Sequence, residues 1–418
     1  MINNVHEFKH KSGLNVIFVP KPGFSERYAI FATKYGSMDS ALKNALSGGI
    51  MEVPLGIAHF LEHKLFEQEQ GNVMADYAVL GAKPNAFTST SKTAYLFSCA
   101  NNFEKCLRLL LNYVQNPYFT KENVENEKGI IAQEINMYLD NPDFMVYMNL
   151  LKGLYVEHPV RNDIAGTVES ISFITPDILN LLYNTFYTPD NMVLVIVGDE
   201  QLEDIERIID ESIEDRWVNR ESTGYVSEIM EESPGICEKI LKIKMEVPTP
   251  IFAFGYKDNE VDGTPLNLCR KELEARILLE VMFGRSSDFY SELYNGGLIN
   301  DTFYTFYEMG RGYAFAMLGG ESKEPEKVIE RIQKQITEAK RGNVIDEKNF
   351  SRIKNSMYGS FIKRFNSVEG VGRLYMNSYL NGVSVIDYFS LYDKIDYYSA
   401  MKQLKLFDES KSSISIAE

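Results

Sequence analysis

Two histidines four residues apart are the side chains in this sequence best suited to chemistry. His59 and His63 enclose the string His-Phe-Leu-Glu-His, and Glu62 stands one residue before the second histidine. On a helix, positions i and i+4 share a face with Cβ atoms about 5–6 Å apart, so two imidazoles there can bind one metal ion. Glu62 then emerges beside the metal, where its carboxylate can hold and deprotonate a water molecule. The spacing predicts a metal-dependent hydrolytic site.

A catalytic zinc ion needs a third protein ligand and one open position. The segment 121–139 offers four glutamates, Glu122, Glu125, Glu127 and Glu134. Glu127 and Glu134 are two helical turns apart and share a face. Apolar side chains fall on an overlapping stripe at Ile130, Ile131, Ile135 and Tyr138. A carboxylate beside such a stripe points inward and needs a cation. We therefore assign Glu127 and Glu134 to the site, and interpret Glu122 and Glu125 as a solvated helix face.

The elements that must position these residues follow an α+β pattern. In the first half, strands are predicted at 14–19, 27–33, 85–98 and 192–197, and helices at 55–67, 103–115, 121–139 and 176–187. The second half repeats this order, with strands near 238–257, a helix at 267–283, strands near 302–319 and helices from 325 onward. We infer two related domains, each a mixed sheet with helices packed on it. The predicted division is 1–222, a linker at 223–235, and 236–418.

Composition restricts the class of partner. The 418 residues include 43 Lys+Arg and 59 Asp+Glu, a net charge of −16. Such a chain has no basic footprint for nucleic acid, and an anionic membrane would repel it. No apolar run approaches the roughly 20 residues that span a bilayer, and no signal peptide is visible. The four cysteines, Cys99, Cys106, Cys237 and Cys269, form no C-x-x-C pair. These features predict a soluble cytoplasmic protein with reduced thiols.

The H-x-x-E-H string is the signature of inverted zinc peptidases. In its wider context the sequence resembles the insulinase/pitrilysin family of these enzymes, which includes the mitochondrial processing peptidases. The matching segments are residues 56–66, 85–89, 127–134 and 186–199. They occur in the order found in the family and span most of residues 50–200.

The resemblance assigns roles to five residues. It implies that His59, His63 and Glu134 bind one zinc ion per chain, which polarises the scissile carbonyl and acidifies water. Glu62 is then the general base, which later delivers the proton to the leaving amine. Glu127 is implied to orient a liganding histidine. The implied reaction is peptide-bond hydrolysis without a covalent intermediate.

The resemblance also predicts how substrate binds. Asn85 and Ala86 fall on the family's edge strand, to which a peptide adds as an extra β-strand. Phe66 either lines a side-chain pocket or simply packs, and the sequence leaves both alternatives open. The family fold implies that the two domains form half of a clamshell. Two such chains would close around a chamber that admits only short or unfolded peptides.

One departure from the family pattern lies in the second half. Active members usually carry an Arg and a Tyr there that bind substrate and stabilise the oxyanion, but this sequence has Tyr294 and Asn300 at the matching positions. Some bacterial relatives are heterodimers in which the second subunit supplies the Arg/Tyr pair. We therefore expect first a heterodimer with such a subunit. The alternatives are a homodimer and the replacement of the missing pair by Tyr304 or Tyr307 on the following strand. The alternative functions are a non-catalytic peptide-binding or assembly subunit and a non-protease zinc enzyme.

Overall fold

The chain folds into two compact units. The computed structural model describes residues 4–218 and 222–418. The first unit comprises Met1–Ile135, Asp163–Ile229 and Ile362–Val385, and the second comprises Asn136–Asn162, Met230–Phe361 and Ile386–Glu418. Both units are discontinuous in sequence. The division at 222 and 236 stays a prediction, and residues 1–3 and 219–221 of the predicted first domain lie outside the described residues.

The elements follow in chain order. The strands are β1 (His6–Lys9), β2 (Asn15–Pro20), β3 (Arg27–Thr33), β4 (Ala41–Asn44), β5 (Ile50–Glu52), β6 (Glu67–Gln68), β7 (Gly71–Asn72), β8 (Lys83–Thr88), β9 (Thr93–Cys99), β10 (Met192–Gly198), β11 (Tyr225–Ser227), β12 (Ile240–Ile243), β13 (Ile251–Lys257), β14 (Tyr304–Gly310), β15 (Tyr313–Glu321) and β16 (Ser412–Ala417). The α-helices are α1 (Ile57–Leu65), α2 (Val73–Leu80), α3 (Phe103–Gln115), α4 (Lys121–Leu139), α5 (Pro142–Leu154), α6 (Val168–Ser172), α7 (Pro176–Phe186), α8 (Leu202–Ser212), α9 (Asp215–Val218), α10 (Pro265–Phe283), α11 (Asp288–Asn295), α12 (Pro325–Lys340), α13 (Glu347–Lys363), α14 (Val368–Leu380), α15 (Val385–Lys394) and α16 (Tyr397–Met401).

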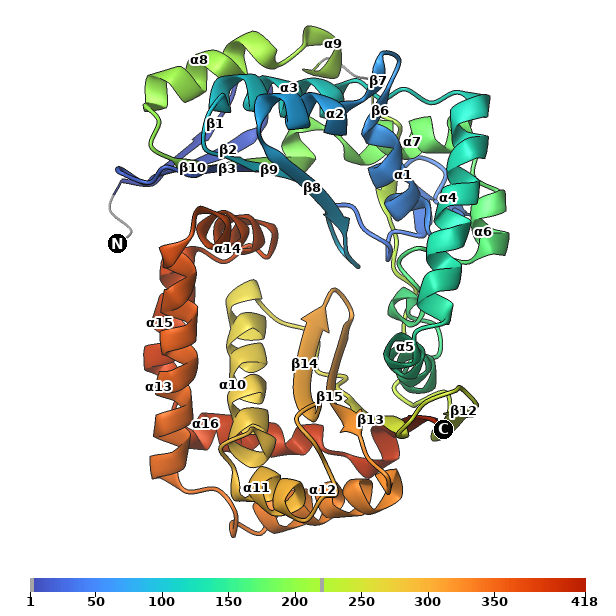
Figure 1. Cartoon of the computed structure of the whole chain (residues 1–418), viewed down its shortest axis with the longest axis vertical. Coiled ribbons are helices and arrows are strands. Elements are labelled where there is room, and N and C mark those ends of the chain that lie inside the picture. The colour runs from blue at the N-terminus through green and yellow to red at the C-terminus, as the bar shows by residue number, and fades with distance from the viewer. Residues whose placement is uncertain (1–3, 219–221) are drawn as a thin grey trace. The chain divides into compact units, whose positions relative to one another are not determined.

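The first unit is built on a six-stranded mixed sheet in the order β1-β2-β10-β3-β9-β8. β10 pairs parallel with β2 and antiparallel with β3, and every residue of β10 is buried. Helix α3 packs on β3 and β9 with α8 beside it, and α14 packs on β2, β3 and β10 from the opposite face (Figure 1). This burial of both faces explains why β10 is a continuous apolar run, Met-Val-Leu-Val-Ile-Val, and does not alternate.

Helix α14 approaches the sheet closely because it carries a glycine at the contact. A Cβ built on Gly372 would lie 2.5 Å from Cδ1 of Tyr28, a buried residue of β3. Any side chain at residue 372 would push the helix away from the sheet. Residues 362–385, which belong to the second half of the sequence, thereby complete the core of the first unit.

The second unit repeats the topology of the first. Its five-stranded sheet has the order β12-β16-β13-β15-β14, in which the last strand of the unit inserts beside the first. β10 takes the same place beside β2, and both insertions are parallel pairs. The remaining neighbours are antiparallel in both sheets. This shared strand order confirms the predicted α+β class with two related mixed sheets.

Two element predictions were wrong. The strand predicted at 85–98 is a hairpin of β8 and β9, whose turn closes through a 2.8 Å bond from Ser89 N to Lys92 O. Alternation continues through the turn residues, so periodicity alone does not reveal the break. Strand β16, Ser-Ser-Ile-Ser-Ile-Ala, lies where only helices were expected. It is short and serine-rich, and its strand character depends on partners β12 and β13, which lie more than 150 residues away.

The segment predicted as a linker is tied to the second unit by a buried carboxylate. Glu232 accepts hydrogen bonds from the backbone N–H groups of Val156, Glu157 and His158, at 3.0, 2.9 and 2.6 Å. It also forms an ion pair with Lys257, whose side chain is 1% exposed. Burial opposes the charge on Glu232, but these donors outweigh it and lower the pKa of the carboxyl group.

Among the described residues, no helix has the length and apolar character that crossing a bilayer requires.

Glu232→Gln is expected to destabilise the second unit by about 3–5 kcal/mol, because it removes the counter-charge of the buried Lys257 ammonium and leaves it only the carbonyls of Ser233 and Gly235. The pKa of Glu232 is lower in the folded state, so its contribution is complete above the unfolded pKa of about 4.3 and is lost as the pH falls through the folded value. The difference from wild type should therefore be full at neutral pH and shrink below about pH 4.3. Urea unfolding followed by circular dichroism at several pH values measures it. Exposed Glu231→Gln is the matched control, and an equal loss in both variants would contradict the prediction.

Candidate metal centre

Helix α1 carries both histidines, and its start is held by a close backbone contact. Gly56 at its N-cap has φ 88°, and a Cβ there would lie 2.2 Å from the carbonyl oxygen of Ala165. The segment after Ala165 is fixed in turn, because Ser170 donates from its hydroxyl to the Leu55 carbonyl at 2.8 Å. Only glycine permits both the left-handed conformation and this approach. The direction of α1, and hence of its histidines, is set by these contacts within the first unit.

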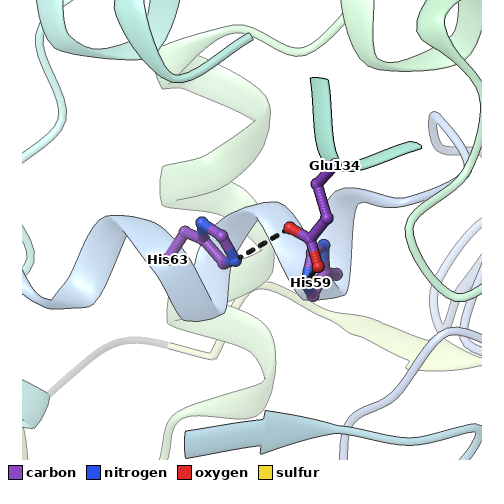
Figure 2. Close-up of side chains that lie close together, drawn as sticks. All are labelled: His59, His63 and Glu134. Atoms are coloured by element: carbon purple, nitrogen blue, oxygen red, sulfur yellow. Dashed lines mark ion pairs between the residues drawn. The ribbon is translucent and has the colours of Figure 1, made fainter. Parts of the chain in front are cut away.

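His59, His63 and Glu134 converge from two helices. Glu134 lies on α4, and one ligand atom from each of the three residues lies within 4.8 Å of the other two. His63 Nε2 is 3.6 Å from Glu134 Oε2, and His59 Nε2 is 3.8 Å from Glu134 Oε1. Figure 2 shows the carboxylate of Glu134 directed at the two imidazole rings. The side chains are 13%, 28% and 26% exposed for His59, His63 and Glu134, so substrate has access to the group.

These separations fit a metal ion better than direct hydrogen bonds. At 3.6 and 3.8 Å the N···O pairs exceed hydrogen-bond distance. Two ligand atoms of a tetrahedral zinc ion lie about 3.3–3.6 Å apart, given metal–ligand distances of about 2.0–2.2 Å. Burial, and then the neighbouring His63, lowers the pKa of His59 to about 4, so this imidazole is neutral, as a ligand must be. The donor set and its geometry therefore fit zinc.

Glu127 fixes the orientation of His63. Its Oε1 lies 2.9 Å from His63 Nδ1, which leaves His63 Nε2 facing Glu134. Burial lowers the pKa of His63, but the hydrogen bond and charge of Glu127 outweigh burial and raise it overall. Glu127 is itself buried and has the ammonium of Lys64 3.9 Å from its Oε2. Lys64 is fully buried and also donates to the Asn123 carbonyl at 3.1 Å. The carboxylate that orients His63 is thus held by a cation.

Glu127→Gln is expected to weaken zinc binding about 10–100-fold, the usual cost of losing a partner that orients a metal ligand. An amide can still accept from His63 Nδ1, but it has no charge to strengthen the imidazole as a ligand. Competition for zinc with a chelator of known affinity measures the effect. Exposed Glu122→Gln on the same helix is the control. Unchanged zinc affinity in Glu127→Gln would exclude this role.

Glu62 lies beside the group formed by His59, His63 and Glu134, and it is buried. It is 7% exposed, and burial raises the pKa of its carboxyl group against the opposing effect of a hydrogen bond from Thr88. The Thr88 hydroxyl donates to Glu62 Oε2 at 2.6 Å. The raised pKa of its carboxyl group and its place beside the candidate ligands suit Glu62 to take up and release a proton.

The face of α4 differs from the prediction at two positions, Ile130 and Tyr138. Val124, Ile131 and Ile135 are buried, whereas Ile130 is 56% exposed, so Ile130 does not belong to the apolar stripe. At 3.6 residues per turn, Glu127 and Glu134 mark one margin of that stripe and Ile130 lies beyond them. Tyr138 is also partly exposed, at 36%. The two glutamates stand between the core and solvent, which is where a site open to substrate must lie.

The predicted substrate-binding residues fall in two environments. Asn85 and Ala86 lie on β8, an edge strand that pairs only with β9 in the part of the chain that the structure describes. Its other edge can accept a further strand. Phe66 is 6% exposed, and its ring packs 5.4 Å from that of Tyr113 and 5.8 Å from that of Tyr95. The packing alternative describes these contacts, and substrate binding by Phe66 stays a prediction.

In the second unit, Tyr294 and Asn300, the residues that depart from the family pattern, contact other residues of the same unit. Tyr294 is 49% exposed and stacks on Tyr290, and Asn300 donates to Glu321 Oε2 at 2.8 Å. Tyr307 is 1% exposed and donates to Asp258 at 2.9 Å, so its hydroxyl is not free to act as a substitute. Tyr304 is 38% exposed, and its hydroxyl lies 3.8 Å from Met317 Sδ.

Sequence reasoning assigned no role to two residues that contact the site. Lys64 follows His63 directly, and the apolar pair Leu65 and Phe66 on its other side was the available signal that it is buried. Thr88 lies in a segment that resembles the family, but nothing in its local pattern places its hydroxyl on Glu62. That contact joins residues 26 positions apart and depends on the packing of α1 against β8.

Comparison with known proteins agrees with this geometry. A model described as insulinase (peptidase family M16) matches residues 47–168, and one described as the peptidase M16 inactive domain matches residues 174–357. YmfH of Bacillus subtilis (strain 168), described as an uncharacterized zinc protease, is 41% identical over 93% of this chain and 90% of its own length.

Solved structures show the same fold along the chain. The crystal structure of an M16-like peptidase from Alicyclobacillus acidocaldarius superposes with a TM-score of 0.93 and 33% identity, covering 99% of this chain and 98% of that one. A protease from Helicobacter pylori has a TM-score of 0.85 at 18% identity, covers both chains fully and supports the fold alone. The predicted resemblance is confirmed, and the chain belongs to the insulinase family of peptidases, family M16.

Proposed function

We propose that this chain is a zinc-dependent endopeptidase that hydrolyses short or unfolded peptides. The observation that carries the proposal is the convergence of His59, His63 and Glu134 within 4.8 Å, with the buried carboxylate of Glu62 on the same helix as the histidines. The name of the Bacillus subtilis relative, a zinc protease, supports the same class of activity. We propose one zinc ion per chain, which the single such group among the described residues supports.

Each residue has a distinct part in the proposed reaction. His59, His63 and Glu134 would hold zinc, which when bound polarises the scissile carbonyl and lowers the pKa of water. Glu62 takes a proton from the attacking water and delivers it to the amine of the leaving peptide. Glu127 keeps His63 in the tautomer that presents Nε2.

Peptide binding is proposed along β8. A substrate in extended conformation would add to the free edge of β8 with main-chain hydrogen bonds, next to Asn85 and Ala86. Such binding recognises the main-chain groups of the peptide, so it favours peptide segments that are not already folded. The predicted chamber between two chains would also restrict substrates to short or unfolded peptides.

A second subunit is part of the proposal. Tyr294 and Asn300 occupy the places where the family resemblance implies Arg and Tyr, and Tyr307 is bound to Asp258. Loss of one oxyanion donor costs about 10²–10³ in rate, so the chain needs this group from elsewhere. We propose a heterodimer with an Arg/Tyr-bearing family member; a homodimer is the alternative in which another residue of this chain, such as Tyr304, supplies the group. Localisation in the cytoplasm stays a prediction.

The experiment is cleavage of a mixed-sequence peptide library by the purified, zinc-loaded chain, with Glu62→Gln as the inactive control. Products are identified by mass spectrometry, and the oligomeric state is measured by sedimentation. Slow cleavage that an Arg/Tyr-bearing subunit accelerates supports the whole proposal. Full activity of the chain alone contradicts the need for a partner.

The presence of Tyr294 and Asn300 in place of the Arg/Tyr pair favours one competing function. Without the Arg/Tyr pair, the chain fits a non-catalytic subunit that binds peptides or assembles a complex. This function predicts that the zinc-loaded chain shows no cleavage with any partner and that Glu62→Gln leaves the activity of the complex unchanged. The intact His59, Glu62, His63 and Glu134 set argues for the peptidase.

A further inference from the structure

The carboxylate of Glu62 has one neighbour that the proposed mechanism has not used. Thr88 ends strand β8, and its Oγ1 lies 2.6 Å from Glu62 Oε2. This distance is typical of a strong hydrogen bond from a hydroxyl to an ionised carboxylate. The bond joins the peptide-binding edge strand to the helix that carries the histidines.

A second threonine constrains the Thr88 hydroxyl. Thr93, opposite Thr88 in the β8–β9 register, has its Oγ1 3.3 Å away. Thr93 is fully buried and donates its own proton to the Tyr35 carbonyl at 2.9 Å. Each hydroxyl has a single proton. With the Thr93 proton on Tyr35, the Thr88 proton is directed to Glu62 Oε2.

We propose that Thr88 is a positioning residue for Glu62: its hydroxyl occupies Oε2 and leaves Oε1 as the oxygen that exchanges protons with water and the leaving amine. This inference rests on the proposed peptidase function and deepens it. Without the hydroxyl, Glu62 would keep only the hydrogen bond from the Thr88 backbone N–H, and its terminal torsion would be less restrained because a carboxylate has a broad rotamer well there. Fixing one oxygen keeps the other in reach of the reacting atoms.

The position of Thr88 also connects substrate binding to this alignment. Residues i and i+2 of a strand share a face, so Thr88 lies on the same face of β8 as Ala86. A peptide that adds to the edge of β8 orders the strand that carries the hydroxyl. Substrate binding then steadies the carboxylate that acts on the bound peptide.

The test compares Thr88→Val, which keeps the shape and removes the hydroxyl, with Thr88→Ser, which keeps the hydroxyl. Ser91→Ala, an exposed residue in the turn of the same hairpin, is the control. We expect Thr88→Val to lower kcat about 10–100-fold with KM nearly unchanged, because a displacement near 1 Å can cost about 10²-fold. Thr88→Ser should restore kcat to within a few-fold of wild type. Zinc affinity should be unchanged in all three variants.

Crystal structures of the zinc-loaded variants provide a measurement that does not depend on activity. The Glu62 carboxylate should move or become disordered in Thr88→Val and stay in place in Thr88→Ser. An unmoved carboxylate in Thr88→Val, or equal kcat losses in both variants, overturns the inference. A wild-type chain without peptidase activity, alone or with an Arg/Tyr-bearing subunit, refutes the proposed function instead, and the carboxylate positions still decide the role of Thr88.

Discussion

Glu62→Gln is expected to lower the rate of peptide hydrolysis by about 10²–10⁴-fold, the contribution of a positioned general acid–base group. The amide has nearly the same shape and can still accept the Thr88 hydrogen bond through its oxygen, but it cannot take a proton from water. Because Glu62 contributes no ligand atom to the His59, His63 and Glu134 group, zinc binding should be unaffected. The loss should therefore appear in kcat while the metal content stays at the wild-type level.

The measurement is steady-state cleavage of a fluorogenic peptide under conditions in which the wild type is active, with zinc quantified in the same samples. Glu69→Gln, an exposed glutamate in the turn between β6 and β7, is the matched control and should retain full activity. A Glu62→Gln variant with more than a tenth of the wild-type kcat would show that another group moves the proton.

Glu134→Ala is expected to weaken zinc binding by more than about 100-fold, beyond the 10–100-fold typical of an outer partner such as Glu127. Its carboxylate faces both imidazoles and carries the only negative charge of the three residues, so its removal leaves two neutral ligands. The side chain is 26% exposed, so folding should tolerate the change. Hydrolysis should fall in parallel and recover in part at high zinc concentration.

Competition with a chelator measures the affinity directly. Glu125→Ala, exposed on the same helix, is the control and should bind zinc like the wild type. Equal affinity in Glu134→Ala and Glu125→Ala would exclude Glu134 as the third ligand. The result also ranks the two carboxylates of α4 by their contribution to zinc affinity, because Glu127→Gln should weaken zinc binding less than Glu134→Ala.

The elements around the site were largely predictable from the sequence. The predicted helices at 103–115 and 121–139 match α3 and α4, and the strand at 27–33 matches β3. In these segments the apolar period agrees with the burial that the fold imposes. The shared face of His59 and His63 follows from helical spacing alone, so the sequence was sufficient to place this pair.

The tertiary structure alone decided the rest. Helix α14 completes the first unit because Gly372 meets Tyr28, and β16 becomes a strand only beside β12 and β13. Lys64 and Thr88 acquire their roles through contacts with Glu127 and Glu62, which lie 63 and 26 positions away. A local pattern records which face of a segment is buried, but not which distant side chain will occupy that face. The sequence by itself therefore determined the paired histidines and the class of fold, whereas the packing of α1 against β8 and α4 determined what holds Glu62 and Glu127 in position.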